Sequence, residues 1–124
     1  DCSKLCEAAN KILSDYEGIY FIQSFNPSVV HWYKKNNKNV LRGQLAFHYK
    51  GKSLLKHTIN RFFANFLVKP DFVAYDQKYA DDFRFKLQKL FGAMPIAWTF
   101  KSEEELKRGK LKVKSYIFEN FRPK

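Results

Sequence analysis

The chain has 124 residues, of which 45% are hydrophobic and 18% are aromatic, including 13 Phe and 7 Tyr. This length suits one domain, and the aromatic content excludes a disordered chain, which is poor in such residues. The 23 Lys and Arg against 12 Asp and Glu give a net charge of +11. That excess favours an anionic partner, namely a nucleic acid, an anionic lipid surface or a phosphorylated substrate, with a solvated basic surface as the alternative. No run of about 18 apolar residues occurs, so we expect no membrane span.

The two cysteines indicate the redox compartment. Cys2 and Cys6 are too few for a disulfide scaffold, and a disulfide between them would strain the helix predicted there. We therefore predict a reducing, cytoplasmic compartment. Half of a metal site is the alternative, with no cluster of Cys or His to complete it. No signal peptide is visible, and a first residue of Asp indicates a trimmed or incomplete chain.

Apolar periodicity, capping residues and turn residues divide the chain into alternating helices and strands. In chain order, the first elements are a helix over 4–16 capped by Ser3, a strand Ile19–Ile22, a helix from Asn26 to the Asn36–Asn39 cluster, a strand Val40–Leu45 and a helix from Ser53 to Pro70. The rest are a strand Phe72–Tyr75, a helix capped by Asp76 and closed by Gly92, a strand Pro95–Thr99, a helix from Ser102 to Gly109 with a Ser102–Glu105 capping box, and a strand Tyr116–Phe118.

Strict alternation of helices with short apolar strands predicts a parallel sheet covered by helices. Strand starts lie 20 to 32 residues apart, which suits the βα units of a barrel. A complete five-stranded doubly wound sheet is the alternative, but neither G-x-G-x-x-G nor G-x-x-x-x-G-K occurs. We therefore predict an α/β fold, a partial TIM (β/α)8 barrel of about five parallel strands.

Five segments in chain order resemble the glycerophosphodiester phosphodiesterases of bacterial type. They are Ile22–Pro27 with its Ser-Phe pair, Val40–Leu45, Lys69–Tyr75, the Trp-Thr strand Ile96–Thr99 followed by Ser102–Glu105, and Tyr116–Glu119. The resemblance covers residues 1–124 as the C-terminal portion of the barrel, from the fourth strand to the eighth. The last strand departs from the family, because Glu119-Asn120 stands where Thr-Asp is usual.

This resemblance implies part of a metal-dependent phosphoric diester hydrolase of lipid and glycerol metabolism. It would cleave glycerophosphodiesters to glycerol 3-phosphate and an alcohol, with Mg²⁺ or Ca²⁺ as cofactor. In the family the metal ligands and acid/base histidines lie on the first three strands, in motifs that this chain does not show. We therefore expect no catalytic residue and no metal ligand here, an inactive isolated chain, and a protein that is cytoplasmic or peripheral to a membrane surface.

Functional side chains of barrel enzymes lie at the C-terminal ends of strands. By resemblance, Trp98 lines the pocket beside the leaving alcohol, while Ser24 and Phe25 lie at the pocket mouth. Gln44 is predicted to contact a glycerol hydroxyl, and for all four residues a purely structural role is the alternative. Tyr75, Asp76 and Glu119 also lie at strand ends. Of these, Asp76 is more typical of a helix cap.

Other polar residues are assigned to the surface. His31, His48 and His57 fall on the predicted outer layer and are expected to be surface residues, not catalysts. Two further readings stay open. One is a basic module for anionic lipid or nucleic acid, the latter disfavoured because the aromatic residues have core spacing. The other is a non-catalytic barrel remnant that forms a homodimer through open edges at Tyr20–Ser24 and Tyr116–Phe118.

Overall fold

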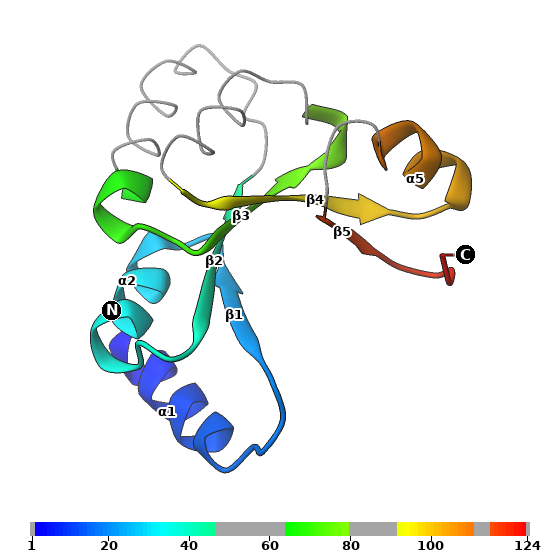
Figure 1. The fold of residues 1–124 in the computed structure, drawn as a ribbon. Helices are drawn as coiled ribbons and strands as arrows, with labels where there is room; N and C mark the ends of the chain where they lie inside the picture. Colours follow the sequence, from blue (N-terminus) through cyan, green and yellow to red (C-terminus); the bar gives the residue numbers. More distant parts are fainter. Residues whose placement is uncertain (1, 47–63, 80–91, 111–114, 124) are drawn as a thin grey trace.

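The computed structural model describes residues 2–46, 64–79, 92–110 and 115–123. In these residues one sheet holds five strands in the order β1-β2-β3-β4-β5. Their bounds are β1 Phe21–Ser24, β2 Leu41–Ala46, β3 Phe72–Asp76, β4 Met94–Phe100 and β5 Ser115–Phe118. Each neighbouring pair is parallel, and the sheet curls into half a barrel with helices on its convex side (Figure 1). The predicted partial α/β barrel is confirmed.

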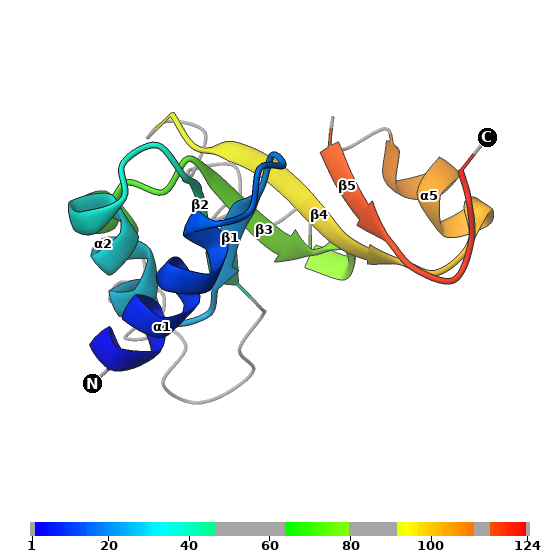
Figure 2. The same cartoon turned by 90° about the horizontal axis from the view of Figure 1, so that it is seen from below.

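Helices flank both limbs of the curled sheet. They are α1 Ser3–Ser14, α2 Pro27–Asn36, the short 3₁₀ helix η1 Gln77–Tyr79 and α5 Glu103–Lys110, and residues 64–68 are helical as well. Figure 2 shows α1 and α2 gathered beside β1 and β2, with α5 beside β5 at the other end of the sheet.

Two predicted capping arrangements set the starts of α2 and α5. The Asn26 Oδ1 accepts a hydrogen bond from the Ser28 N–H at 2.9 Å, and Pro27 occupies the first helical position. At α5, Ser102 Oγ accepts from the Glu105 N–H at 3.2 Å, while the Glu105 carboxylate accepts from the Lys101 N–H at 2.9 Å. This is the reciprocal pattern of a capping box.

Several boundaries differ from the prediction by one or two residues, and for the starts of α1 and β1 the cause is visible. The helix α1 begins at Ser3, because the carbonyl of Cys2 already accepts from the Cys6 N–H at 3.0 Å, so Ser3 is not the cap. The strand β1 begins at Phe21, since Ile19 lies outside the ladder and is 100% exposed. Asp76 ends β3 and caps the helical residues that follow, as predicted, because its Oδ1 accepts from the Lys78 N–H at 3.0 Å at the start of η1. The rest of that predicted helix, and most of the one from Ser53, lie outside the described residues.

Side chains alternate between the two faces of the sheet. On the convex face, a first cluster joins Val73, Tyr75 and Ala97 to Phe100 and to Leu106 of α5. A second cluster joins Cys6 of α1, Tyr33 of α2 and Val40, with Ile22 packed against them. The alternate residues of the strands therefore face the concave side of the curl, among them Phe21, Gly43, Phe72, Ala74, Asp76 and Trp98.

An ion pair joins the starts of β2 and β3. The Arg42 side chain donates to both carboxylate oxygens of Asp71, from Nε at 3.1 Å and from Nη2 at 3.2 Å. The backbone N–H of Arg42 also donates to Asp71 Oδ2 at 2.8 Å, and the Asp71 N–H donates to the Arg42 carbonyl at 2.8 Å. The Asp71 carbonyl accepts from the Met94 N–H at 3.0 Å, so one residue ties three strands at this end of the sheet.

Candidate functional site

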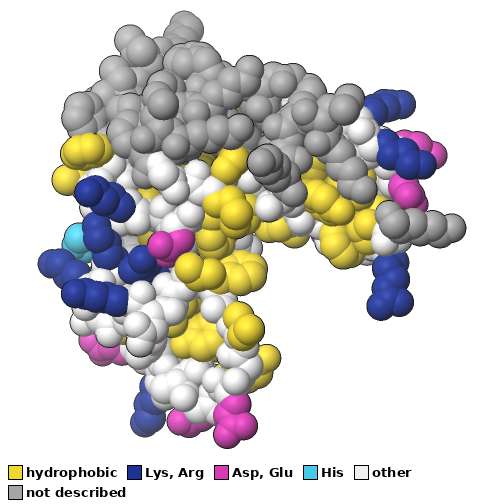
Figure 3. All heavy atoms as spheres, viewed as in Figure 1, with side chains coloured by type: hydrophobic (Ala, Val, Ile, Leu, Met, Phe, Trp, Pro, Cys, Tyr) yellow, Lys and Arg dark blue, Asp and Glu magenta, His cyan; other side chains and the backbone are white. Residues whose placement is uncertain are grey.

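The concave face of the half-barrel is mainly apolar. The ring of Phe21 meets the ring of Phe72 edge-on, with centroids 5.4 Å apart. The Phe72 ring lies directly over Gly43, where an added Cβ would collide with it. Figure 3 shows hydrophobic side chains along this hollow, and Leu41 and Met94 on the same face are half exposed. The face is thus suited to contact carbon atoms of a partner or ligand.

Trp98 and Phe25 form an aromatic wall at the C-terminal ends of the strands. Their ring centroids lie 6.1 Å apart at an interplanar angle of 73°, an edge-to-face contact. The two residues belong to β4 and to the turn after β1, which β2 and β3 separate in the sheet, so the contact crosses the curl. The indole Nε1 of Trp98 is buried and has no hydrogen-bond partner within the described residues. An unused N–H beside an apolar surface can bind a ligand oxygen.

Gln44 supports the turn that carries Phe25. Its side chain is 4% exposed, and Nε2 donates to the carbonyls of Ser24 at 2.9 Å, Phe25 at 3.0 Å and Leu45 at 3.1 Å. The Ser24 hydroxyl accepts from the Asn26 N–H at 3.1 Å. Of the four predicted site residues, the structure brings Phe25 and Trp98 into contact. Ser24 and Gln44 are paired in the sheet, in register with Val73, and so point to the convex face. There the Gln44 amide holds the backbone that carries Phe25. The predicted contact of Gln44 with a glycerol hydroxyl stays a prediction.

The other strand-end residues lie elsewhere or have local partners. Tyr75 is buried in the first cluster of the convex face, the one that contains Phe100 and Leu106. Asp76 caps the turn of η1, and Glu119 forms an exposed ion pair with Lys101 at 3.2 Å.

Gln77 was not singled out from the sequence, yet it joins the ends of β3 and β4. Its Nε2 donates to the Thr99 carbonyl at 3.2 Å and to Glu105 Oε2 at 3.0 Å. The backbone N–H of Lys101 is the main cause that lowers the pKa of the Glu105 carboxyl, and the Gln77 amide adds to it. A glutamine after a strand carries no pattern that marks it, because its partners are 22 and 28 residues away along the chain.

The second cluster of the convex face, which contains Cys6 and Tyr33, holds two titratable groups with raised pKa values. Burial raises the pKa of the Cys6 thiol, and the neighbouring Cys2 raises it further; both cysteines are free thiols. Burial also raises the pKa of Tyr33, with smaller contributions from Cys6 and Tyr20. The Tyr33 hydroxyl is buried with no partner in the described part of the chain. These groups face the helices and are remote from the aromatic wall.

Metal-binding groups do not gather in the part of the chain that the structure describes. Among these residues, no three His, Cys, Asp or Glu side chains lie close enough to hold a metal ion. His31 lies on α2, on the outer layer as predicted, while His48 and His57 lie outside the described residues. The residues that the structure describes therefore offer no site for a divalent cation.

These features define a class: a partial parallel α/β barrel with an aromatic wall at its strand ends. No protein-family model matches the chain, and no curated protein matches it in sequence. Solved structures do match in fold. A protein of Silicibacter pomeroyi DSS-3, provisionally named a glycerophosphoryl diester phosphodiesterase, has a TM-score of 0.68 at 10% identity, covering 94% of this chain and 40% of that one. An Oleispira antarctica phosphodiesterase, solved with its product sn-glycerol-3-phosphate, has a TM-score of 0.66 at 14% identity, covering 94% and 45%.

The likeness to these phosphodiesterases is one of fold, since the identities are low. The chain spans less than half the length of either structure. None of the helices in the described ranges is both long and apolar enough to cross a membrane.

Proposed function

We propose that the chain is part of a phosphoric diester hydrolase that cleaves glycerophosphodiesters to glycerol 3-phosphate and an alcohol. Two independent lines support this. The fold is that of the two phosphodiesterase structures. The short motifs that resemble the family, Ser24-Phe25 and Trp98-Thr99, lie at the C-terminal ends of strands, where barrel enzymes place their sites.

The contact between Phe25 and Trp98 carries the proposal. An alcohol such as choline or glycerol has a small carbon skeleton, which gains from contact with the flat indole and phenyl faces. The Trp98 Nε1 is buried without a partner in the described residues, and burial of such a donor without an acceptor costs about 1–3 kcal/mol. A substrate oxygen at this point would relieve that cost. Binding of this kind orients the leaving alcohol against the wall.

The chemical step itself is assigned to other residues of the protein. The described residues offer no metal cluster, and His31 lies on a helix on the convex side. We therefore propose that this chain contributes the pocket wall, and that the acid/base groups and the ligands of a Mg²⁺ or Ca²⁺ ion lie outside the described part. A chelator should abolish turnover of the intact protein, and one of these two ions should restore it.

Substitutions of Trp98 test the wall in the intact protein, with glycerophosphocholine as substrate and glycerol 3-phosphate release as readout. W98F keeps a ring but removes the N–H, and should lower kcat/KM by roughly tenfold, the value of one hydrogen bond. W98A removes the wall as well and should lower it by roughly a hundredfold or more. W32F is the matched control, because Trp32 packs with the cluster on the convex side, and should leave kcat/KM unchanged.

Two results would contradict the proposal. One is a W98A protein with the circular dichroism spectrum and the kcat/KM of the parent. The other is turnover by a purified chain of these 124 residues alone, which would mean that the acid/base groups had been misplaced.

A further inference from the structure

Cationic and acidic residues are segregated along the chain. Residues 18–70 contain nine Lys and Arg residues and no Asp or Glu. Four of these lysines can be placed on the structure: Lys34 and Lys35 in the last turn of α2, Lys38 just beyond it, and Lys69 after the helical residues 64–68. Lys35, Lys38 and Lys69 are exposed. The four placed lysines therefore contribute positive potential to the part of the surface formed by the end of α2 and by Lys69.

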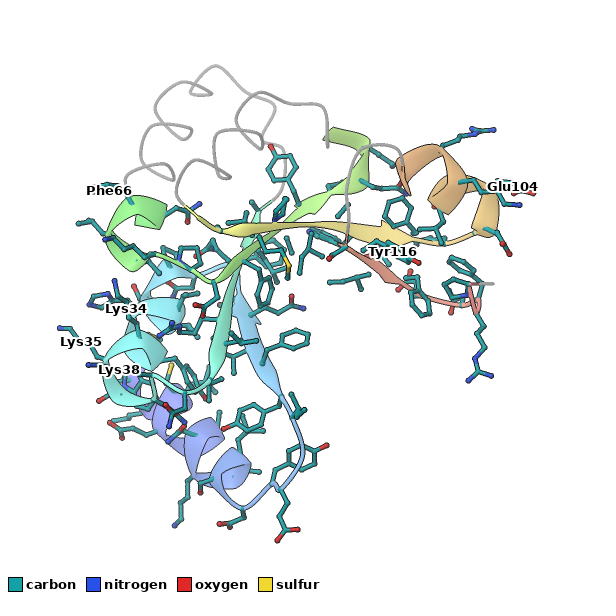
Figure 4. All side chains as sticks on the ribbon, in the orientation of Figure 1. Lys34, Lys35, Lys38, Phe66, Glu104 and Tyr116 are labelled. Carbon is teal, nitrogen blue, oxygen red and sulfur yellow. The ribbon has the colours of Figure 1, made fainter. Side chains whose placement is uncertain are left out.

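Two large apolar side chains protrude beside these lysines. Phe66 is 50% exposed and Leu67 is 68% exposed. The Lys34 Nζ donates to the Leu67 carbonyl at 3.0 Å, so α2 and residues 64–68 are in direct contact. Figure 4 shows Lys34, Lys35 and Lys38 on the same side of the molecule as Phe66, all directed away from the sheet. We call Lys34, Lys35, Lys38, Phe66, Leu67 and Lys69 the basic-apolar face.

The local backbone holds the protruding pair in place. The helical residues 64–68 end at Lys69, whose φ of 47° is left-handed and whose N–H donates to the Asn65 carbonyl at 2.8 Å. Pro70 follows and cannot continue a helix. The nearest acid in sequence, Asp71, is bound by Arg42 at 3.0 Å and so does not offset the lysines. Phe66 and Leu67 thus lie in the last helical residues before the turn at Lys69, and the Lys34 contact with the Leu67 carbonyl fixes this end.

From this juxtaposition we propose that the basic-apolar face docks on an anionic lipid bilayer. Lysines near such a surface are attracted by its negative potential, while Phe and Leu side chains enter the boundary of the acyl region. A single-stranded nucleic acid would also attract the lysines, but successive bases need several flat rings, and the face as defined has one, that of Phe66. The inference does not depend on the proposed hydrolase activity, because the face lies on the convex side and the aromatic wall on the concave side.

Vesicle co-sedimentation of the intact protein tests this docking. The protein should bind vesicles of phosphatidylcholine mixed with phosphatidylserine, and should bind phosphatidylcholine alone weakly. The K35Q/K38Q variant should lower the partition coefficient by roughly thirtyfold, since each lysine contributes roughly fivefold near an anionic surface. K107Q/R108Q on α5 is the matched control with the same change in charge, and should bind as the parent does. L67S tests the apolar part and should lower binding by roughly fivefold without a change in charge.

Three outcomes would overturn the proposal. The first is equal binding to the two kinds of vesicle. The second is an equal loss in K107Q/R108Q and in K35Q/K38Q, which would reflect net charge alone. The third is tight binding of a single-stranded RNA that K35Q/K38Q weakens while vesicles stay unbound, which would assign the face to nucleic acid. Circular dichroism of each variant separates loss of the face from loss of the fold.

Discussion

Replacement of Gln44 by leucine should destabilise the protein and loosen the aromatic wall. The Gln44 amide has two hydrogens and faces three carbonyls, those of Ser24, Phe25 and Leu45. Loss of two hydrogen bonds to part-buried carbonyls costs about 2–4 kcal/mol, and removal of the unpartnered Oε1 offsets about 1 kcal/mol. The net loss in the free energy of unfolding is therefore about 1–3 kcal/mol.

Urea unfolding followed by circular dichroism measures this loss. The matched control is Q23L, the same substitution at an exposed position of β1, which should change the free energy of unfolding by no more than about 0.5 kcal/mol. In a W32F background, where Trp98 is the one remaining indole, Q44L should also shift the fluorescence, since Phe25 loses its support. A Q44L protein as stable as Q23L, with unchanged fluorescence, would refute the supporting role of this amide.

Three further substitutions probe the packing and the charges. G43A should destabilise the protein by about 1–3 kcal/mol in urea unfolding, because the new methyl group collides with the Phe72 ring. Y33F should leave stability unchanged or raise it by up to about 1 kcal/mol, since it removes a buried hydroxyl that has no partner among the described residues. Glu105 has a lowered pKa, so its contribution to stability is present above the ordinary value of 4.5 and is lost as the pH falls through the lower folded value. E105Q should lack that part of the pH dependence.

Each of these three can fail in a distinct way. A fully stable G43A would mean that Phe72 moves aside at no cost. A loss above about 1 kcal/mol in Y33F would show that the hydroxyl has a partner. Parallel stability–pH curves for E105Q and the parent below pH 4.5 would remove the role given to the Lys101 N–H.

The fold was largely predictable because each strand is marked locally. The short apolar runs before Asn26 and after Pro70 predict strands, and the capping residues Asn26 and Ser102 predict where α2 and α5 begin. Strand limits were less accurate, because pairing sets them and hydrophobicity does not. Ile19 has the right composition for β1 but no partner on β2, whose pairing with β1 begins at Leu41.

The sequence singled out Trp98 and Phe25 but not their contact, and their role in binding a substrate stays a prediction. The rule that barrel sites lie at strand ends brought out Trp98 and Phe25, but their contact spans 73 positions and depends on the curl of the sheet. The sequence likewise cannot tell whether an amide at a strand end faces solvent or backbone. The Gln44 amide donates to the carbonyls of Ser24 and Phe25 because the end of the neighbouring strand β1 lies within its reach.

The ion pair between Arg42 and Asp71 lies at the opposite end of the strands from the aromatic wall. A slip of one residue between β2 and β3 would send every side chain to the wrong face, and this pair resists that slip without using any residue near Trp98. Strand alignment and the aromatic wall that we propose as the ligand contact therefore lie at opposite ends of the same strands. A library randomised at positions 24, 25 and 98 should therefore yield many folded members with altered selectivity, whereas one randomised at positions 42 and 71 should yield few that fold.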